Sequence, residues 1–149
     1  MRYQRDLDID APRDTVLALF LEPDNLTVWQ PDLVSFEHVS GEGPRDLGAV
    51  TRQVHRMGKR EVEMTETITV NDPPENFAAI YEADGIWNLV ENRFTETDAG
   101  RTHWALTSEC RGTGFMVKLM LLLAPGMFRR QTDDLMHRFK AFVESQSAE

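Results

Sequence analysis

The chain has 149 residues, a hydrophobic content of 41% and a formal net charge of −9 at pH 7. This length is typical of one domain with a substantial core, so we expect residues 1–149 to form a single domain. The acidic balance argues against a nucleic-acid partner and disfavours an anionic membrane surface, since both require clustered Lys and Arg. The N-terminus, Met1 to Asp6, lacks the apolar region of a secretory signal, which favours a cytoplasmic protein.

The N-terminal quarter predicts a strand followed by two short helices. Residues Tyr3 to Ile9 alternate polar and apolar side chains, as a half-buried strand does. Pro12 suits the first turn of a helix that ends before Pro23. The segment 23–31 is bracketed by prolines and has room for one further helical turn, with Trp29 just before extended structure resumes.

Six further strands follow, joined by short connections rich in Gly, Pro and Asp. Consecutive strands joined so tightly are antiparallel neighbours, which predicts a meander. Two of the connections, Gly58-Lys59 and Asp84-Gly85, have the length of a tight hairpin turn. The predicted strands are Leu33 to Val39, Gly48 to Met57, Arg60 to Val70, Asn76 to Ala83, Ile86 to Thr95 and Thr102 to Arg111.

The C-terminal part predicts a long helix from Phe115 to about Ser145. Its first half, Phe115 to Phe128, is apolar nearly all round but too short to cross a membrane, so no transmembrane segment is expected. Its second half has one apolar stripe, typical of a helix that packs on a sheet. Pro125-Gly126 should kink the helix or divide it in two. The stripe consists of Phe128, Leu135, Phe139 and Phe142.

These elements predict an α+β fold. A curved, seven-stranded antiparallel sheet would wrap around the long C-terminal helix, with the two short helices after the first strand. A helix laid across a curved sheet leaves a gap between the two layers. We therefore expect the binding site in that gap.

Alternation along the strands predicts which side chains face the gap. The even positions of 60–70 are the more apolar, which places Glu66 among apolar neighbours. In 48–57, Val50 and Val54 favour the even side, which would also turn Arg52 inward. For the last three strands the predicted inward residues are Phe77, Ala79, Tyr81 and Ala83; Ile86, Asn88, Val90, Asn92 and Phe94; and Trp104, Leu106, Ser108 and Cys110.

The predicted wall is mostly apolar with a few polar groups, as a pocket for a largely hydrophobic molecule requires. Glu66 could instead pair with Arg52 without any ligand. The methionines could fill the core, but those on the final helix are interpreted as ligand contacts in a lid, with Pro125-Gly126 as its gate. The predicted ligand-binding residues are Trp29, Arg52, Met64, Glu66, Tyr81, Asn88, Asn92, Trp104, Ser108, Met116, Met120, Leu123 and Met127.

No established catalytic, metal or cofactor motif is present, so no metal and no cofactor are expected. The single cysteine, Cys110, excludes an intramolecular disulfide. The histidines fall on separate predicted elements without ligand spacing. They are His38, His55, His103 and His137.

Three segments and the closing helix carry a resemblance to a known superfamily. The segments are Ile9-Asp10-Ala11-Pro12, Pro23-Asp24-Asn25-Leu26 and Trp29-Gln30-Pro31-Asp32. The chain resembles the START-like, or Bet v 1-like, helix-grip superfamily, and within it the bacterial polyketide cyclase/dehydrase and lipid-transport group. The resemblance implies a sheet gripping the C-terminal helix around a hydrophobic cavity. Members bind lipids, polyketides, plant hormones or quinones, act as cyclases, or activate a chaperone, and share no catalytic motif.

Three functions therefore remain open. The first is binding or transport of a small hydrophobic molecule, such as a lipid, polyketide or quinone-like compound. The second is a cyclase or dehydratase in which Glu66, with Tyr81 or Arg52, moves protons. The third is a chaperone-activator-like protein-interaction module with an open apolar groove. The sheet edges and the helix surface also have room for a homodimer contact.

Overall fold

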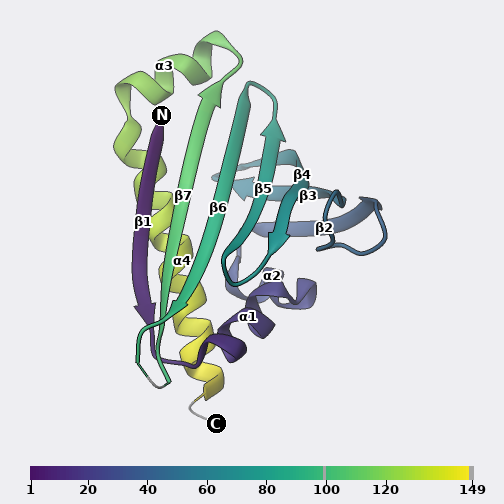
Figure 1. Ribbon diagram of the computed structural model, residues 1–149. Coiled ribbons are helices and arrows are strands. Elements are labelled where there is room, and N and C mark those ends of the chain that lie inside the picture. The colour runs from purple at the N-terminus through teal and green to yellow at the C-terminus, as the bar shows by residue number, and fades with distance from the viewer. Residues whose placement is uncertain (99, 148–149) are drawn as a thin grey trace.

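The computed structural model describes residues 1–98 and 100–147, which form an antiparallel sheet of seven strands packed on a long helix (Figure 1). The strand order is β1-β7-β6-β5-β4-β3-β2, so β2 to β7 form the predicted meander and β1 pairs with β7. This confirms the α+β class. The strands are β1 (Arg2–Ile9), β2 (Leu33–Ser40), β3 (Val50–Met57), β4 (Arg60–Asp72), β5 (Asn76–Ala83), β6 (Ile86–Glu96) and β7 (Thr102–Gly112).

The predicted C-terminal helix is divided in two, α3 (Phe115–Leu123) and α4 (Pro125–Ser147). The division falls before Pro125 because proline has no N–H to continue the helical ladder, and its ring clashes with the preceding turn. Figure 1 shows α4 running along one face of the sheet behind β1 and β7, with α3 at the opposite end of the molecule from α1. The short helices are α1 (Arg13–Leu21), the 3-10 turn η1 (Pro23–Asn25) and α2 (Leu26–Trp29).

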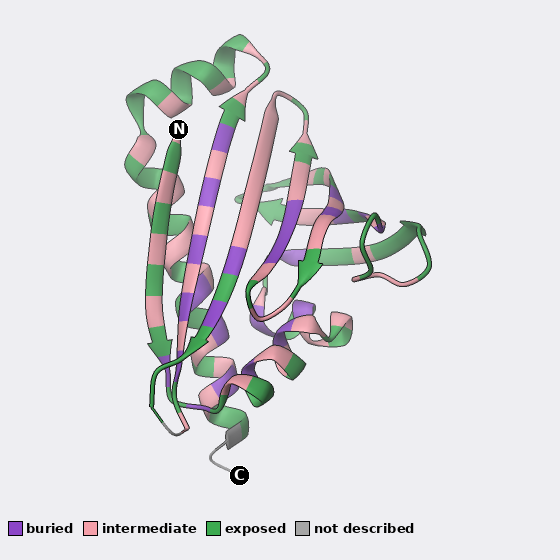
Figure 2. Ribbon diagram, viewed as in Figure 1, coloured by how far each residue is buried: buried purple, intermediate pink, exposed green. Residues whose placement is uncertain are grey.

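An aromatic cluster joins α1, α2, α4 and the sheet. Phe139 on α4 is fully buried, and its ring centroid lies 4.9 Å from that of Trp29 and 5.2 Å from that of Trp104. Phe20 on α1 packs against the same three rings. Leu135 and Phe142 pack against this core, as the helical stripe predicts. The buried positions of α4 lie on the side that faces the sheet (Figure 2).

Alternation correctly predicted the inward faces of β4 to β7, but the prediction for β3 was wrong. Thr51 and Gln53 are buried, whereas Arg52 is half-exposed on the outer face, with its Nε 3.0 Å from a carboxylate oxygen of Glu63. The cause is register. The two-residue turn pairs Met57 with Arg60, which sets Thr51 opposite Glu66 and Gln53 opposite Met64. Directly opposed residues share a face, so the odd residues of β3 follow the even residues of β4 inward.

The prediction that α3 forms a lid over the cavity was also wrong. Its Met116, Met120 and Leu123 are 67%, 43% and 72% exposed, and Met127 at the start of α4 is 37% exposed. None of the four lines the cavity. Because the helix is divided before Pro125, α3 departs from the direction of α4 and lies across the end of β7 (Figure 1).

Candidate ligand-binding cavity

A cavity of about 260 Å³ lies between the sheet and α4. Its wall is formed by the inward side chains of β3 to β7, closed by α1, α2 and α4. Eight of the thirteen predicted site residues line it, namely Trp29, Met64, Glu66, Tyr81, Asn88, Asn92, Trp104 and Ser108. The five that do not are Arg52, Met116, Met120, Leu123 and Met127.

Glu66, at the centre of one wall, is only 1% exposed. Its carboxylate accepts hydrogen bonds from the Tyr81 hydroxyl at 2.7 Å and from Thr51 Oγ1 at 3.2 Å. Nη1 of Arg45 lies 3.5 Å from both carboxylate oxygens. Groups from three neighbouring segments thus contact the Glu66 carboxylate. A carboxylate removed from water requires such partners.

Arg45, which sequence reasoning missed, takes the place predicted for Arg52 as the partner of Glu66. It lies in the connection between β2 and β3, and its side chain is 12% exposed. Nη2 donates to the Phe20 carbonyl at 3.3 Å, and the guanidinium carbon lies 5.3 Å from the ring centroid of Phe77. Strand alternation could not find this residue, because a connecting loop has no periodic pattern.

Burial favours the neutral form of two neighbouring groups. Burial raises the pKa of Tyr81 well above its ordinary value, and the Glu66 carboxylate raises it further, so the hydroxyl remains protonated and donates to Glu66. Burial lowers the pKa of His55, although the negative charges of Asp32 and Glu66 act in the opposite direction. At neutral pH the imidazole of His55 is therefore uncharged.

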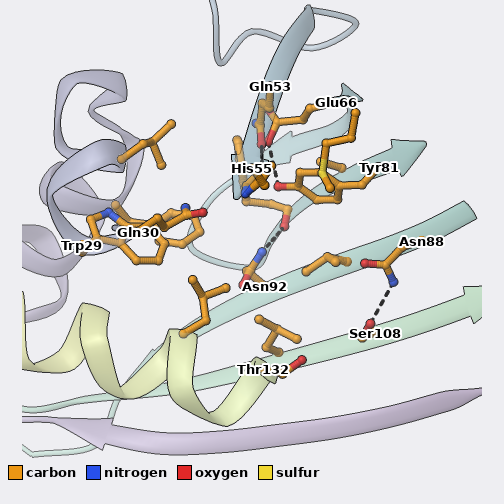
Figure 3. Close-up of a pocket in the computed structure, with 18 of the residues that line it drawn as sticks. Trp29, Gln30, Gln53, His55, Glu66, Tyr81, Asn88, Asn92, Ser108 and Thr132 are labelled. Carbon is orange, nitrogen blue, oxygen red and sulfur yellow. Dashed lines mark hydrogen bonds between the residues drawn. The ribbon is translucent and has the colours of Figure 1, made fainter. Parts of the chain in front are cut away.

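His55 also has a defined hydrogen-bond partner. Its Nε2 lies 2.8 Å from Oε1 of Gln53, so a neutral imidazole donates from Nε2 and keeps Nδ1 as an acceptor. In the part of the chain that the structure describes, Nδ1 has no protein partner. Figure 3 shows His55, Gln53, Glu66 and Tyr81 grouped on one side of the cavity.

A second polar group, Asn88 with Ser108, lies apart from the first on β6 and β7 (Figure 3). Nδ2 of Asn88 donates to Oγ of Ser108 at 2.9 Å and to the Glu109 carbonyl at 3.0 Å. Asn92, by contrast, is held by the fold through both its amide nitrogen and its amide oxygen. It accepts from Trp104 Nε1 at 2.9 Å and donates to the Phe77 carbonyl at 3.2 Å. We therefore regard Asn92 as a structural part of the wall.

The cavity adjoins an outer hollow of about 620 Å³ between β3, α4 and the start of β2. Gln30, His55, Met64 and Leu135 line both spaces. Arg138 Nη1 lies 3.7 Å from a carboxylate oxygen of Asp32 across the outer hollow. These shared residues show that the outer hollow and the inner cavity are neighbours.

The resemblance implied a curved sheet around the C-terminal helix with a hydrophobic cavity between them, and the structure has a cavity between the sheet and α4. Residues 2–144 match the family described as polyketide cyclase / dehydrase and lipid transport. The chain belongs to this family. No curated protein sequence matches the chain.

Solved structures agree with this family assignment at the level of the fold. The Zhui aromatase/cyclase from Streptomyces sp. R1128 superposes with a TM-score of 0.80 at 15% identity, over 99% of this chain and 95% of that one. A START superfamily protein from Mycobacterium smegmatis gives 0.76 at 11% identity, over 97% and 98%. A truncated norcoclaurine synthase from Thalictrum flavum gives 0.74 at 12% identity, over 96% and 92%. The chain thus has the fold of these proteins.

Two further observations concern metal-binding groups and membrane-spanning helices. Within residues 1–98 and 100–147, no group of three or more His, Cys, Asp or Glu side chains is arranged to hold a metal ion. In the same residues, no helix is long and apolar enough to cross a membrane.

Proposed function

We propose that the protein binds a small, largely apolar molecule carrying one or two hydroxyl groups, in the cavity between the sheet and α4. The observation that carries this proposal is the pair of separate polar groups in a wall that also contains many apolar side chains. Ligand sites have this composition, because apolar surface supplies affinity and a few polar groups supply orientation.

The residues of the wall offer both unpartnered donors and unpartnered acceptors: Nε1 of Trp29 and Nε of Arg45 are buried N–H groups without a hydrogen-bond partner among the described residues. Nδ1 of His55 is an acceptor without a partner among the described residues, and the same holds for Oδ1 of Asn88, whose amide nitrogen is already used. The carboxylate of Glu66 already accepts from three protein partners, so it is less available as an acceptor for a ligand. A hydroxyl both donates and accepts, so a hydroxyl-bearing compound could satisfy either kind of free atom.

The volume sets the ligand's size. About 260 Å³ is slightly below the range of about 300–1,000 Å³ typical of ligand pockets, so a compact molecule would fill the inner cavity. A longer molecule would extend into the outer hollow past His55 and Met64.

Native mass spectrometry of protein purified gently from its own host tests the proposal. The wild-type protein should carry a small-molecule adduct that denaturation releases. Ala83→Phe places a large side chain on the cavity wall and should abolish the adduct. Glu82→Phe adds the same side chain to the opposite, exposed face of β5 and should retain it.

Two results would contradict the binding proposal. One is a clean apo mass for the wild-type protein. The other is equal loading of the two phenylalanine variants, which would place the adduct outside the cavity.

A second candidate is an enzyme of the cyclase or dehydratase type, favoured by the neutral imidazole of His55 on the cavity wall. In a dehydration, Nδ1 would take a proton from the carbon between a ketone and a β-hydroxyl, leaving an enolate. The resulting imidazolium would then protonate the β-hydroxyl, which leaves as water as the enolate electrons form the carbon–carbon double bond. Glu66 would position Tyr81 and Arg45 rather than act as the base.

Turnover of a β-hydroxyketone polyketide mimic tests His55 as the base and Glu66 as a positioning residue. His55→Asn should abolish turnover while binding of the mimic persists. Glu66→Gln should lower turnover less, because a neutral amide still accepts from Tyr81. Full activity of His55→Asn would exclude this residue as the base.

A further inference from the structure

Helix α3 presents an apolar surface to solvent that the fold does not cover. Phe115, Met116, Leu122 and Leu123 are 77%, 67%, 76% and 72% exposed. No residue of the helix is buried. Single exposed apolar residues are ordinary, but a continuous apolar surface marks an interaction site.

The sequence segment that contains α3 carries charges of one sign. Between Glu109 and Asp133 the sequence contains no acidic residue, although the whole chain has a net charge of −9. The cations in this segment are Arg111, Lys118, Arg129 and Arg130. All are exposed except Arg129, which is half-buried. The nearest acidic residues lie beside this segment: Glu109 is paired with Arg111 at 3.1 Å, and Asp84 precedes Gly85 in the turn on which α3 packs.

The size of the helix and its charges argue against a second copy of the chain as the partner. A nine-residue helix is about 14 Å long, and its exposed side covers only a small part of the ~800 Å² that each partner buries in a standard interface. A two-fold contact through α3 would also bring Lys118 and its neighbouring arginines towards their own equivalents. Both effects make self-association through this surface weak.

A lipid surface suits the same features. A spanning helix needs about 20 apolar residues, so nine residues can only lie in the interface. Helices that lie there bury apolar side chains about 5–10 Å deep and gain affinity from cations that meet anionic headgroups. We propose that α3 docks the protein on an anionic lipid bilayer, with its phenylalanine and leucines in the acyl boundary and Lys118, Arg129 and Arg130 at the headgroups.

The position of α3 relates this docking surface to the cavity. A Cβ atom built on Gly85 would lie 3.0 Å from Cγ2 of Val117, so α3 packs closely on the β5–β6 hairpin. Ala83 and Ile86, which flank the turn of that hairpin, line the cavity. Docking through α3 would bring this end of the cavity next to the bilayer.

Co-sedimentation with vesicles tests the proposal. The wild-type protein should bind vesicles of equal parts phosphatidylglycerol and phosphatidylcholine more tightly than vesicles of phosphatidylcholine alone, and added salt should weaken the difference. Leu122→Glu/Leu123→Glu should lower the partition coefficient by about tenfold or more, since it removes apolar burial and adds repulsion. Both leucines are largely exposed, so folding should be retained.

Two further variants provide a control for the added acidic charge and test the contribution of the cations. Leu47→Glu changes a leucine that is 67% exposed in the β2–β3 connection, remote in sequence from α3, and should bind vesicles like the wild type. Arg129→Gln/Arg130→Gln should lower binding to anionic vesicles while leaving the weak binding to phosphatidylcholine unchanged.

Three outcomes would overturn the proposal. The wild-type protein fails to bind anionic vesicles, or Leu122→Glu/Leu123→Glu binds them as well as the wild type does. The third is that the wild type binds no vesicles but forms a dimer in analytical ultracentrifugation, and that this double variant is monomeric. No cavity ligand takes part in these measurements. Their failure is therefore distinct from a failure of the cavity proposal, which Ala83→Phe tests.

Discussion

The cavity wall and helix α3 depart from the usual distribution of polar and apolar groups in opposite directions. The wall buries a carboxylate, Glu66, at 1% exposure, whereas α3 exposes Leu122 at 76%. The first departure is compensated within the chain, because Tyr81, Thr51 and Arg45 all contact the carboxylate. The second has no such compensation among the described residues. The buried charge of the wall is therefore compensated by the protein itself, while the apolar surface of α3 is suited to a surface outside the protein.

The largest expected effect comes from breaking the compensation at Glu66. Glu66→Leu leaves the Arg45 guanidinium buried without its counter-ion and two hydroxyls without their acceptor. The free energy of unfolding, measured by urea denaturation, should fall by about 3–5 kcal/mol.

The double variant Glu66→Leu/Arg45→Met is the control for this interpretation. It also removes the unpaired cation and should be more stable than Glu66→Leu alone. If the double variant is the less stable of the two, Arg45 stabilises the wall by packing between Phe20 and Phe77 and not through the charge of Glu66.

An intermediate effect concerns the pH dependence of stability. Because burial lowers the pKa of folded His55 below its ordinary 6.5, the unfolded chain binds this proton more readily. The free energy of unfolding should therefore decrease as pH falls below about 6.5, and level off only below the pKa of the folded state. His55→Gln should make the decrease between about pH 7 and pH 5 less steep. Parallel pH profiles for the two proteins would show that His55 is solvated in the folded state.

The smallest expected effect is on α3. Leu122→Ser should change the free energy of unfolding by less than about 0.5 kcal/mol, since this side chain is already in water. Phe139→Ala, on the buried face of α4, should cost about 3–5 kcal/mol in the same urea titration. A large loss for Leu122→Ser would mean that α3 is covered in solution, and would remove the contrast with the cavity wall.

Several parts of the site were predictable from sequence. In β4, β5 and β7 one face is clearly more apolar than the other, so alternation correctly placed Glu66, Tyr81 and Ser108 on the cavity wall. The strand β3 misled this reasoning because its inward residues, Thr51 and Gln53, are polar and its outward residues include valines. A sequence signal for the correct face did exist. The two-residue turn Gly58-Lys59 sets the register, and the face of β4 then decides the face of β3.

Local sequence alone determined the order of the elements, their turns and the division of the final helix, because hydrophobic periodicity and the geometry of Gly and Pro act over a few residues. Tertiary structure alone decided that Arg45 pairs with Glu66, that His55 lies on the cavity wall, and that α3 faces solvent. These outcomes depend on which segments meet across the fold. A run of apolar residues is the same in sequence whether it covers a cavity or lies on the surface, and only the direction of α3 after the break before Pro125 distinguishes the two.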